Sequence, residues 1–206
     1  MGRFTRAESH ARTRQALLDA AAEVFANRGF GGASLDEIAE VAGYTKGAVY
    51  SNFGSKDELF LAVLQDRMRR QVELLDGLAE RAKAAPGDVP LLLPDLDSLD
   101  QQWCLLIFEF WLYALRNPSS GERLAAVYRQ FRADLAPLLA PYTGASMQPE
   151  ELAAAGIAIY QGLALQRHLD PDAARADFVA RLLRTLQDAS QKAQTGLRSE
   201  GAEPVS

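Results

Sequence analysis

Residues that favour helices dominate this chain of 206 residues. It contains 35 Ala and 30 Leu, against 19 residues of Val, Ile and Thr together. Ala and Leu have high helix propensity, whereas β-branched residues favour strands. The composition therefore predicts an all-α protein. Its 48% of hydrophobic and 24% of charged residues are typical of a folded globular chain rather than of a disordered or membrane protein.

Cysteine content and hydropathy predict a cytoplasmic protein. The single cysteine, Cys104, cannot form an internal disulfide, and the N-terminus does not resemble a secretion signal. The longest nearly apolar run covers residues 103–115 and is interrupted by Glu109. It is shorter than the ~18 residues that a membrane span needs, so we expect a buried helix and no membrane partner.

The net charge of −5 is unevenly distributed. Residues 1–56 carry seven basic and six acidic side chains, and the remaining 150 residues carry 15 and 21. Four arginines and one glutamate fall within the first 14 residues. Any contact with a polyanion is therefore expected to use the N-terminal quarter.

Hydrophobic periodicity and helix breakers divide the chain into a series of helices. We expect helices over residues 9–28, 35–42, 45–52, 56–84, 98–117, 121–140, 149–168 and 171–190. Residues 191–206 have low hydrophobicity and are expected to be disordered. The glycine-rich stretch at 29–32 follows a helix rather than a strand, so we do not interpret it as a dinucleotide-binding turn.

The spacing of residues 35–52 is typical of two helices that cross at a tight turn. Ser34 and Glu37 form a capping-box pattern, and Thr45 is an N-cap candidate for the second helix. Ala39, Gly43 and Val49 supply the small residue, the turn residue and the apolar contact that such a pair requires. This pattern alone fits either a DNA-binding helix-turn-helix or an ordinary helical hairpin.

The placement of two of the four lysines favours DNA binding. Lys46 and Lys56 both fall in the first turn of a helix, where a cation opposes the helix dipole at a cost of about 0.3 to 1 kcal/mol. A phosphate at each helix start would accept hydrogen bonds from the ammonium and from the free backbone amides. The alternative is that both lysines are simply solvated.

Short and flat side chains on the second helix would allow close approach to a major groove. Lys46 is long enough to reach a guanine edge. Asn52 is either a phosphate contact or a helix terminator. The candidate DNA contacts are Tyr44, Thr45, Lys46, Tyr50, Ser51, Asn52 and Lys56.

The stretch SLDEIAEVAG at 34–43, followed by TKGAVYSNFGSKDEL at 45–59, resembles the TetR family of bacterial transcriptional regulators. This resemblance implies a DNA-binding domain at 1–54 and an effector-binding and dimerisation domain at 55–190. It places the DNA contacts on Thr45, Lys46, Tyr50 and Lys56. Many members have His where this chain has Asn52, and Asn can also donate to a phosphate.

Arginines precede and begin the first predicted helix. Arg3 and Arg6 lie on an N-terminal arm that would enter a minor groove or follow the phosphates. Arg12 and Arg14 continue the basic segment into the helix. A solvated terminus is an equal alternative.

Aromatic residues in the 98–117 helix suggest a cavity for a small apolar or aromatic effector. One stripe carries Trp103, Ile107, Phe110 and Trp111, although a plain core position is the more common role for each aromatic residue among them. Tyr128 and Gln161 are candidate polar contacts in the same cavity. Glu109 would face the cavity and pair with a cationic ligand, or would meet an arginine.

The last two predicted helices resemble the family's dimerisation pair. Glycines within the first of them cost about 1 kcal/mol each relative to Ala, which close approach of another helix would offset. The candidate interface residues are Gly156, Ile159, Gly162, Leu163, Phe178, Leu182 and Leu186.

Two other classes of function compete with DNA binding. An enzyme is disfavoured because the chain has only two histidines, His10 and His168, and lacks nucleophile and metal motifs. No cofactor or metal is expected. The second alternative is an all-helical carrier or adaptor without DNA binding. By analogy with the family, we expect a homodimeric repressor that leaves operator DNA when it binds its effector.

Overall fold

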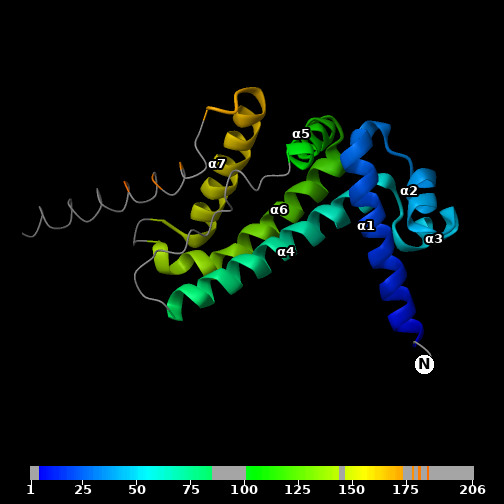
Figure 1. The fold of residues 1–206 in the computed structure, drawn as a ribbon, viewed down its shortest axis with the longest axis horizontal. Coiled ribbons are helices and arrows are strands. Elements are labelled where there is room, and N and C mark those ends of the chain that lie inside the picture. The colour runs from blue at the N-terminus through cyan, green and yellow to red at the C-terminus, as the bar shows by residue number, and fades with distance from the viewer. Residues whose placement is uncertain are drawn as a thin grey trace, which may run out of the picture.

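The computed structural model describes residues 5–84, 101–143 and 147–173, together with residues 178, 181 and 185. The described residues form helices joined by short turns and contain no strand, so the predicted all-α fold is confirmed. The long helix α4 (Lys56–Ala84) runs through the molecule (Figure 1). None of the described helices combines the length and the apolar character that a bilayer crossing requires.

Three helices form the end of the molecule at which α4 begins (Figure 1). These are α1 (Arg6–Gly32), α2 (Leu35–Ala42) and α3 (Lys46–Asn52). Helix α1 starts earlier than predicted because Thr5 and Glu8 form a capping box. The helix is interrupted at Gly29, whose φ of 71° is accessible to glycine without strain.

Local capping signals correctly placed α2 and α3. Ser34 Oγ accepts from the Glu37 amide, and Thr45 Oγ1 accepts from the Ala48 amide. Gly43 ends α2 in the left-handed conformation, with φ of 72°. The Glu37 side chain departs from the predicted capping box, because it pairs with Arg28 at 3.1 Å.

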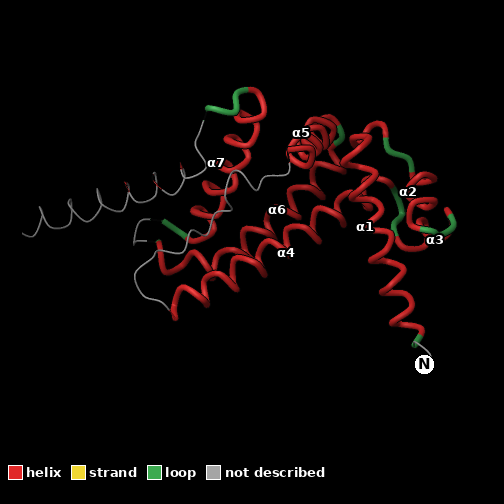
Figure 2. Tube along the Cα trace, in the orientation of Figure 1, coloured by secondary structure: helices red, strands yellow, loops and turns green. Residues whose placement is uncertain are grey.

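The remaining helices lie on the other side of α1 and along α4 (Figure 2). They are α5 (Gln101–Arg116), α6 (Pro118–Leu139), a short 3-10 turn (Ala140–Tyr142) and α7 (Pro149–Leu169). Helix α6 begins three residues before the predicted start because Pro118 occupies its first turn. The first residues of the predicted 98–117 helix, most of the 171–190 helix and the 191–206 tail lie outside the described residues.

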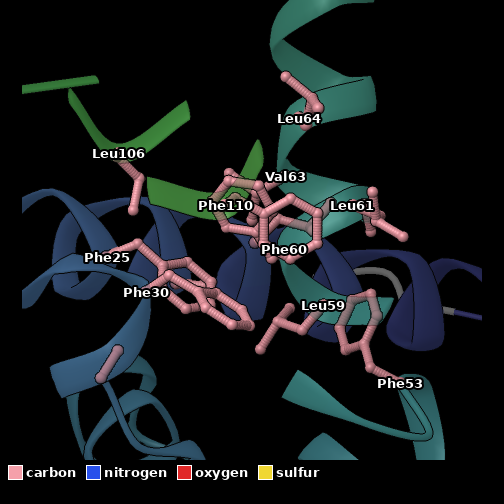
Figure 3. Close-up of a cluster of buried hydrophobic side chains, with 14 of the residues drawn as sticks. Phe25, Phe30, Phe53, Leu59, Phe60, Leu61, Val63, Leu64, Leu106 and Phe110 are labelled. Atoms are coloured by element: carbon pink, nitrogen blue, oxygen red, sulfur yellow. The ribbon is translucent and has the colours of Figure 1, made fainter. Parts of the chain in front are cut away.

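One aromatic core joins α1 to α4 and α5 (Figure 3). The Phe60 ring from α4 stacks on Phe110 from α5, with 4.1 Å between centroids. Phe30, at the end of α1, meets Phe110 edge-on at 4.8 Å. Phe25 from α1 packs on both Phe30 and Phe60. Helices α1 to α3 therefore share their core with α5, across the expected domain boundary at 54/55.

This shared core predicts that the two regions unfold together. Phe110→Ala should lower the free energy of unfolding by about 3–5 kcal/mol, because Phe110 is fully buried. The matched control is Leu112→Ala, since Leu112 is 56% exposed on the same helix and its loss should change stability by only about 0.5 kcal/mol. Urea unfolding followed by circular dichroism measures both. A separate unfolding transition for α1–α3 would contradict the prediction.

Candidate nucleic-acid interface and effector cavity

Helices α2 and α3 pack on α1 through the residues that the spacing predicted. Ala39 and Val49 are buried, and both belong to the main core. The Tyr44 amide donates to the Ala39 carbonyl at 2.9 Å, which closes the turn around Gly43. This arrangement fixes α3 relative to α1 and leaves its other face open to solvent.

The open face of α3 carries most of the candidate DNA contacts. Tyr50 is 50% exposed, and Tyr44, Thr45, Lys46 and Ser51 are exposed as well. Figure 1 shows α3 at the outer end of the molecule, near the start of α4 and away from α5, α6 and α7. No other described element covers this face, so it is accessible to a large partner.

Asn52 is used within its own helix. Its Nδ2 donates to the Ala48 carbonyl at 2.8 Å, and the side chain is half-buried. Ser51 Oγ donates to the same carbonyl at 3.0 Å. Among the described residues, Asn52 Oδ1 is buried without a hydrogen-bond partner. This geometry corresponds to the helix-terminator alternative.

Lys46 forms an exposed ion pair between α3 and α2. Its Nζ lies 2.7 Å from Asp36 Oδ1, and this hydrogen-bonded partner raises the pKa of Lys46. Exposed ion pairs contribute only about 0–1 kcal/mol, because both groups remain solvated. A phosphate can therefore replace Asp36 as the partner of Lys46 at small cost.

Lys56 has a different environment from Lys46. Its Nζ donates to the carbonyl of Ala33 at 3.1 Å and to that of Gly31 at 3.4 Å, and it lies 4.7 Å from the Phe30 ring centroid. Lys56 therefore joins the start of α4 to the end of α1 and to Ala33, the residue that follows α1. Because both lysines have partners within the protein, their first-turn positions do not by themselves require a phosphate.

Two of the N-terminal arginines, Arg6 and Arg14, lie on α1. Arg6 is the first residue of α1 and is exposed, so it lies on a helix rather than on an arm. Arg14 stacks over the Phe53 ring at 4.4 Å, which joins α1 to the end of α3. Arg3 lies outside the described residues.

A pocket of about 350 Å³ lies between α5, α6 and α7 and is open to solvent on one side; we call it the cavity. Its walls are mostly apolar and include Trp111, Tyr128 and Gln161, three of the six predicted effector contacts. The other three, Trp103, Ile107 and Phe110, do not line this cavity. They are buried in the main core, which corresponds to the plain-core alternative for these residues.

Three side chains form the polar centre of the cavity. The Tyr128 hydroxyl accepts from Trp111 Nε1 at 3.1 Å and from Gln161 Nε2 at 2.7 Å. Burial raises the pKa of Tyr128, so the phenol stays protonated at neutral pH. Both hydrogen bonds use the oxygen as acceptor, and the phenol proton can be donated to a ligand. Arg132, one turn further along α6, is the one charged residue of the lining.

The predicted role of Glu109 is wrong. Its carboxylate faces neither the cavity nor an arginine, and it accepts from the amides of Phe30 at 2.9 Å and Gly31 at 2.6 Å. Asp36, the partner of Lys46, and Arg132, in the cavity wall, were missed as well. The single acidic residue in an apolar run was the available signal for Glu109, but its partners lie too far along the chain to be inferred.

Helix α7 carries four of the predicted dimer residues, of which Ile159 is exposed and the others are half-buried. Ile159 is 37% exposed, and a Cβ added at Gly162 would meet no atom within 4 Å. Gly156, Leu163 and Phe178 are half-buried. Leu182 and Leu186 lie outside the described residues. The dimer interface stays a prediction.

Comparison with known proteins places the chain in a family. Residues 17–63 match the family model "Bacterial regulatory proteins, tetR family", and residues 89–191 match "BetI-type transcriptional repressor, C-terminal". The chain is 32% identical over 167 residues to the HTH-type nicotine-responsive transcriptional repressor HdnoR of Paenarthrobacter nicotinovorans. That match covers 77% of this chain and 84% of the relative. The chain belongs to the TetR family.

Other transcriptional regulators are similar to this chain in sequence or in fold. The HTH-type transcriptional activator FasR of Mycolicibacterium smegmatis is 38% identical over 99 residues, which cover 45% of this chain and 44% of the relative. A putative transcriptional regulator from Pseudomonas aeruginosa PAO1 has the same fold, with a TM-score of 0.64 at 23% identity over 87% of this chain and 90% of that chain.

Membership of the TetR family decides between the classes of function. This protein is a DNA-binding transcriptional regulator and not an enzyme. The helical carrier without DNA binding is therefore set aside.

The Lys46–Asp36 pair predicts that Asp36→Asn strengthens DNA binding by this TetR-family protein. Removing the carboxylate leaves the Lys46 ammonium free to bind a phosphate. The Kd for DNA should therefore fall by about two- to fivefold, which corresponds to the free energy of an exposed ion pair. Fluorescence anisotropy with a duplex selected in vitro measures the change. In a Lys46→Ala background, Asp36→Asn should have little effect. An equal gain in both backgrounds would show that Asp36 does not act through Lys46.

Proposed function

We propose that this protein is a repressor that binds a near-palindromic operator as a homodimer and is released by a small apolar or aromatic effector. The main observation in support of operator binding is the exposed polar face of α3 at the outer end of the molecule. A rigid helix with short side chains fits a major groove, which is about 12 Å wide.

Within this proposal, Thr45, Lys46 and Tyr50 make the central DNA contacts. Lys46 exchanges Asp36 for a phosphate or a guanine edge, while Thr45 donates its hydroxyl proton from the N-terminus of α3. Tyr44 and Ser51, which are also exposed, contact flanking phosphates.

The flanking candidates have smaller roles. Arg6, exposed at the start of α1, adds a contact to the DNA backbone. Lys56 acts by positioning the start of α4, because its ammonium already binds two carbonyls. Asn52 ends α3, and Arg3 stays a candidate for a minor-groove contact.

A homodimer would place two copies of α3 in successive major grooves, which lie about 34–36 Å apart. The exposed surface of α7 and the chain that follows it are the proposed dimer contacts. Helix α7 and the predicted 171–190 helix of each protomer would together form a four-helix interface.

The proposed effector binds in the cavity between α5, α6 and α7. The apolar lining favours an apolar or aromatic body, and Tyr128 and Arg132 favour a polar acceptor group on it. A relative that responds to nicotine, by its name, supports a small ring compound as the effector. A group with acceptor oxygens, such as a carboxylate, would suit Arg132 best.

A double variant tests DNA recognition. Lys46→Ala with Tyr50→Ala should weaken operator binding at least about 100-fold, since individual DNA contacts contribute about 1–3 kcal/mol each. The matched control is Arg116→Ala with Tyr142→Ala, which removes one cation and one exposed tyrosine away from α3. Gel-shift titration with full-length protein measures both. Unchanged binding by the first variant would refute the assignment.

A ligand series tests the effector cavity. Indole rings that carry a carboxylate, a carboxamide or an amine should be compared in thermal unfolding of the full-length protein. The carboxylate should raise Tm by several degrees, because a ligand at 100 times its Kd stabilises by about 2.7 kcal/mol. Arg132→Met should remove that difference between carboxylate and carboxamide. A Tm that responds equally to all three compounds would contradict the role of Arg132.

A further inference from the structure

Residues 29–33, which are the end of α1 from its interruption at Gly29 together with Ala33, bind a carboxylate from a distant helix. We call these residues the α1–α2 turn. Glu109 Oε2 accepts from the Phe30 amide at 2.9 Å, and Oε1 accepts from the Gly31 amide at 2.6 Å. Successive amides that point to one side form an anion-binding concavity. Here the anion is a side chain of the protein itself, 78 positions further along the chain.

The glycines of the α1–α2 turn leave room for this carboxylate. A Cβ at Gly29 would lie 2.6 Å from Glu109 Oε2, and a Cβ at Gly31 would lie 3.2 Å from Oε1. Gly29 also has φ of 71°, a conformation that strains other residues. Both the backbone conformation and the space at this point therefore suit a bound carboxylate.

Two further contacts join α5 and α6 to the first turn of α4. Asp57 accepts hydrogen bonds from the hydroxyls of Tyr113, on α5, and Ser120, on α6. Arg123 on α6 forms an ion pair with Glu58 at 3.0 Å. Helix α5 thus contacts both the α1–α2 turn and the start of α4, and α6 contacts the start of α4.

The same segment of α5 also lines the cavity. Glu109, Phe110 and Tyr113 face the α1–α2 turn and the core, whereas Trp111 and Ala114 face the cavity. These residues lie within two turns of one helix, and a helix moves as a unit over such a length. A displacement of Trp111 by a ligand would therefore move Glu109.

We propose that Glu109 is the positioning residue through which the cavity controls the DNA-binding helices, by holding or releasing the Phe30 and Gly31 amides. This inference rests on the proposed effector response of the protein. When the carboxylate is bound, the end of α1 and the start of α2 are fixed relative to α5. When the cavity fills, α5 shifts, the two amides are released and α3 loses its fixed orientation.

Amide hydrogen exchange tests the proposal without an operator or a known ligand. Filling the cavity of the full-length protein with Ala158→Trp, or from the α6 side with Ala125→Trp, replaces the effector; both alanines line the cavity. Either variant should raise exchange of the Phe30 and Gly31 amides, resolved by NMR, at least about threefold. In a Glu109→Ala background, where exchange is already fast, the same variants should add nothing.

Matched variants separate positioning from general loss of stability. Glu109→Asp keeps the charge but shortens the side chain, and Gly31→Ala crowds the carboxylate; each should speed exchange at the two amides alone. Glu122→Ala, an exposed acidic residue on α6, should leave it unchanged. If neither cavity variant changes exchange, or if both act equally without Glu109, the proposal is overturned.

Operator binding provides the second readout. Glu109→Asp should weaken operator binding at least about fivefold while thermal unfolding still shows a folded protein. Unchanged affinity despite fast amide exchange would overturn the positioning role. If the unaltered protein binds no DNA, the proposed function fails, whereas the exchange result is unaffected by that failure.

Discussion

The α1–α2 turn at residues 29–33 is bound on both sides, and the geometry of the molecule depends on it. Glu109 accepts from two of its amides, and Lys56 donates to two of its carbonyls. Phe30, between these polar contacts, packs into the aromatic core beside Phe60 and Phe110. Backbone groups that a helix end leaves unsatisfied are thus used to join three helices. The orientation of α2 and α3 follows from this junction.

Local signals in the sequence were enough to predict most of the helices. Ser34, Gly43 and Thr45 act on backbone groups within four residues of themselves, so their pattern alone located α2 and α3. Helix α4 begins where predicted, and Ser55 Oγ accepts from the Glu58 amide at its start. Helix α1 begins before its predicted start because Thr5 and Glu8 form a capping box there.

The functional roles of single residues were less predictable, because they depend on contacts between distant segments. Lys46 and Lys56 have the same first-turn position, but one forms an exposed ion pair and the other binds the carbonyls of a turn. The aromatic residues of α5 likewise divide between core and cavity according to the helices that pack on each side. Trp111 faces the cavity, whereas Phe110 is fully buried. Hydrophobic periodicity identifies α5 as an apolar helix, but it does not show which helix packs against each of its faces.

The most direct test is a crystal structure of the full-length protein bound to its selected operator duplex. The account predicts α3 in the major groove, with Lys46 moved from Asp36 to the DNA. It also predicts that Lys56 and Glu109 keep their bonds to the α1–α2 turn. A complex with α3 outside the groove, or with Lys56 turned from the turn to a phosphate, would contradict the account.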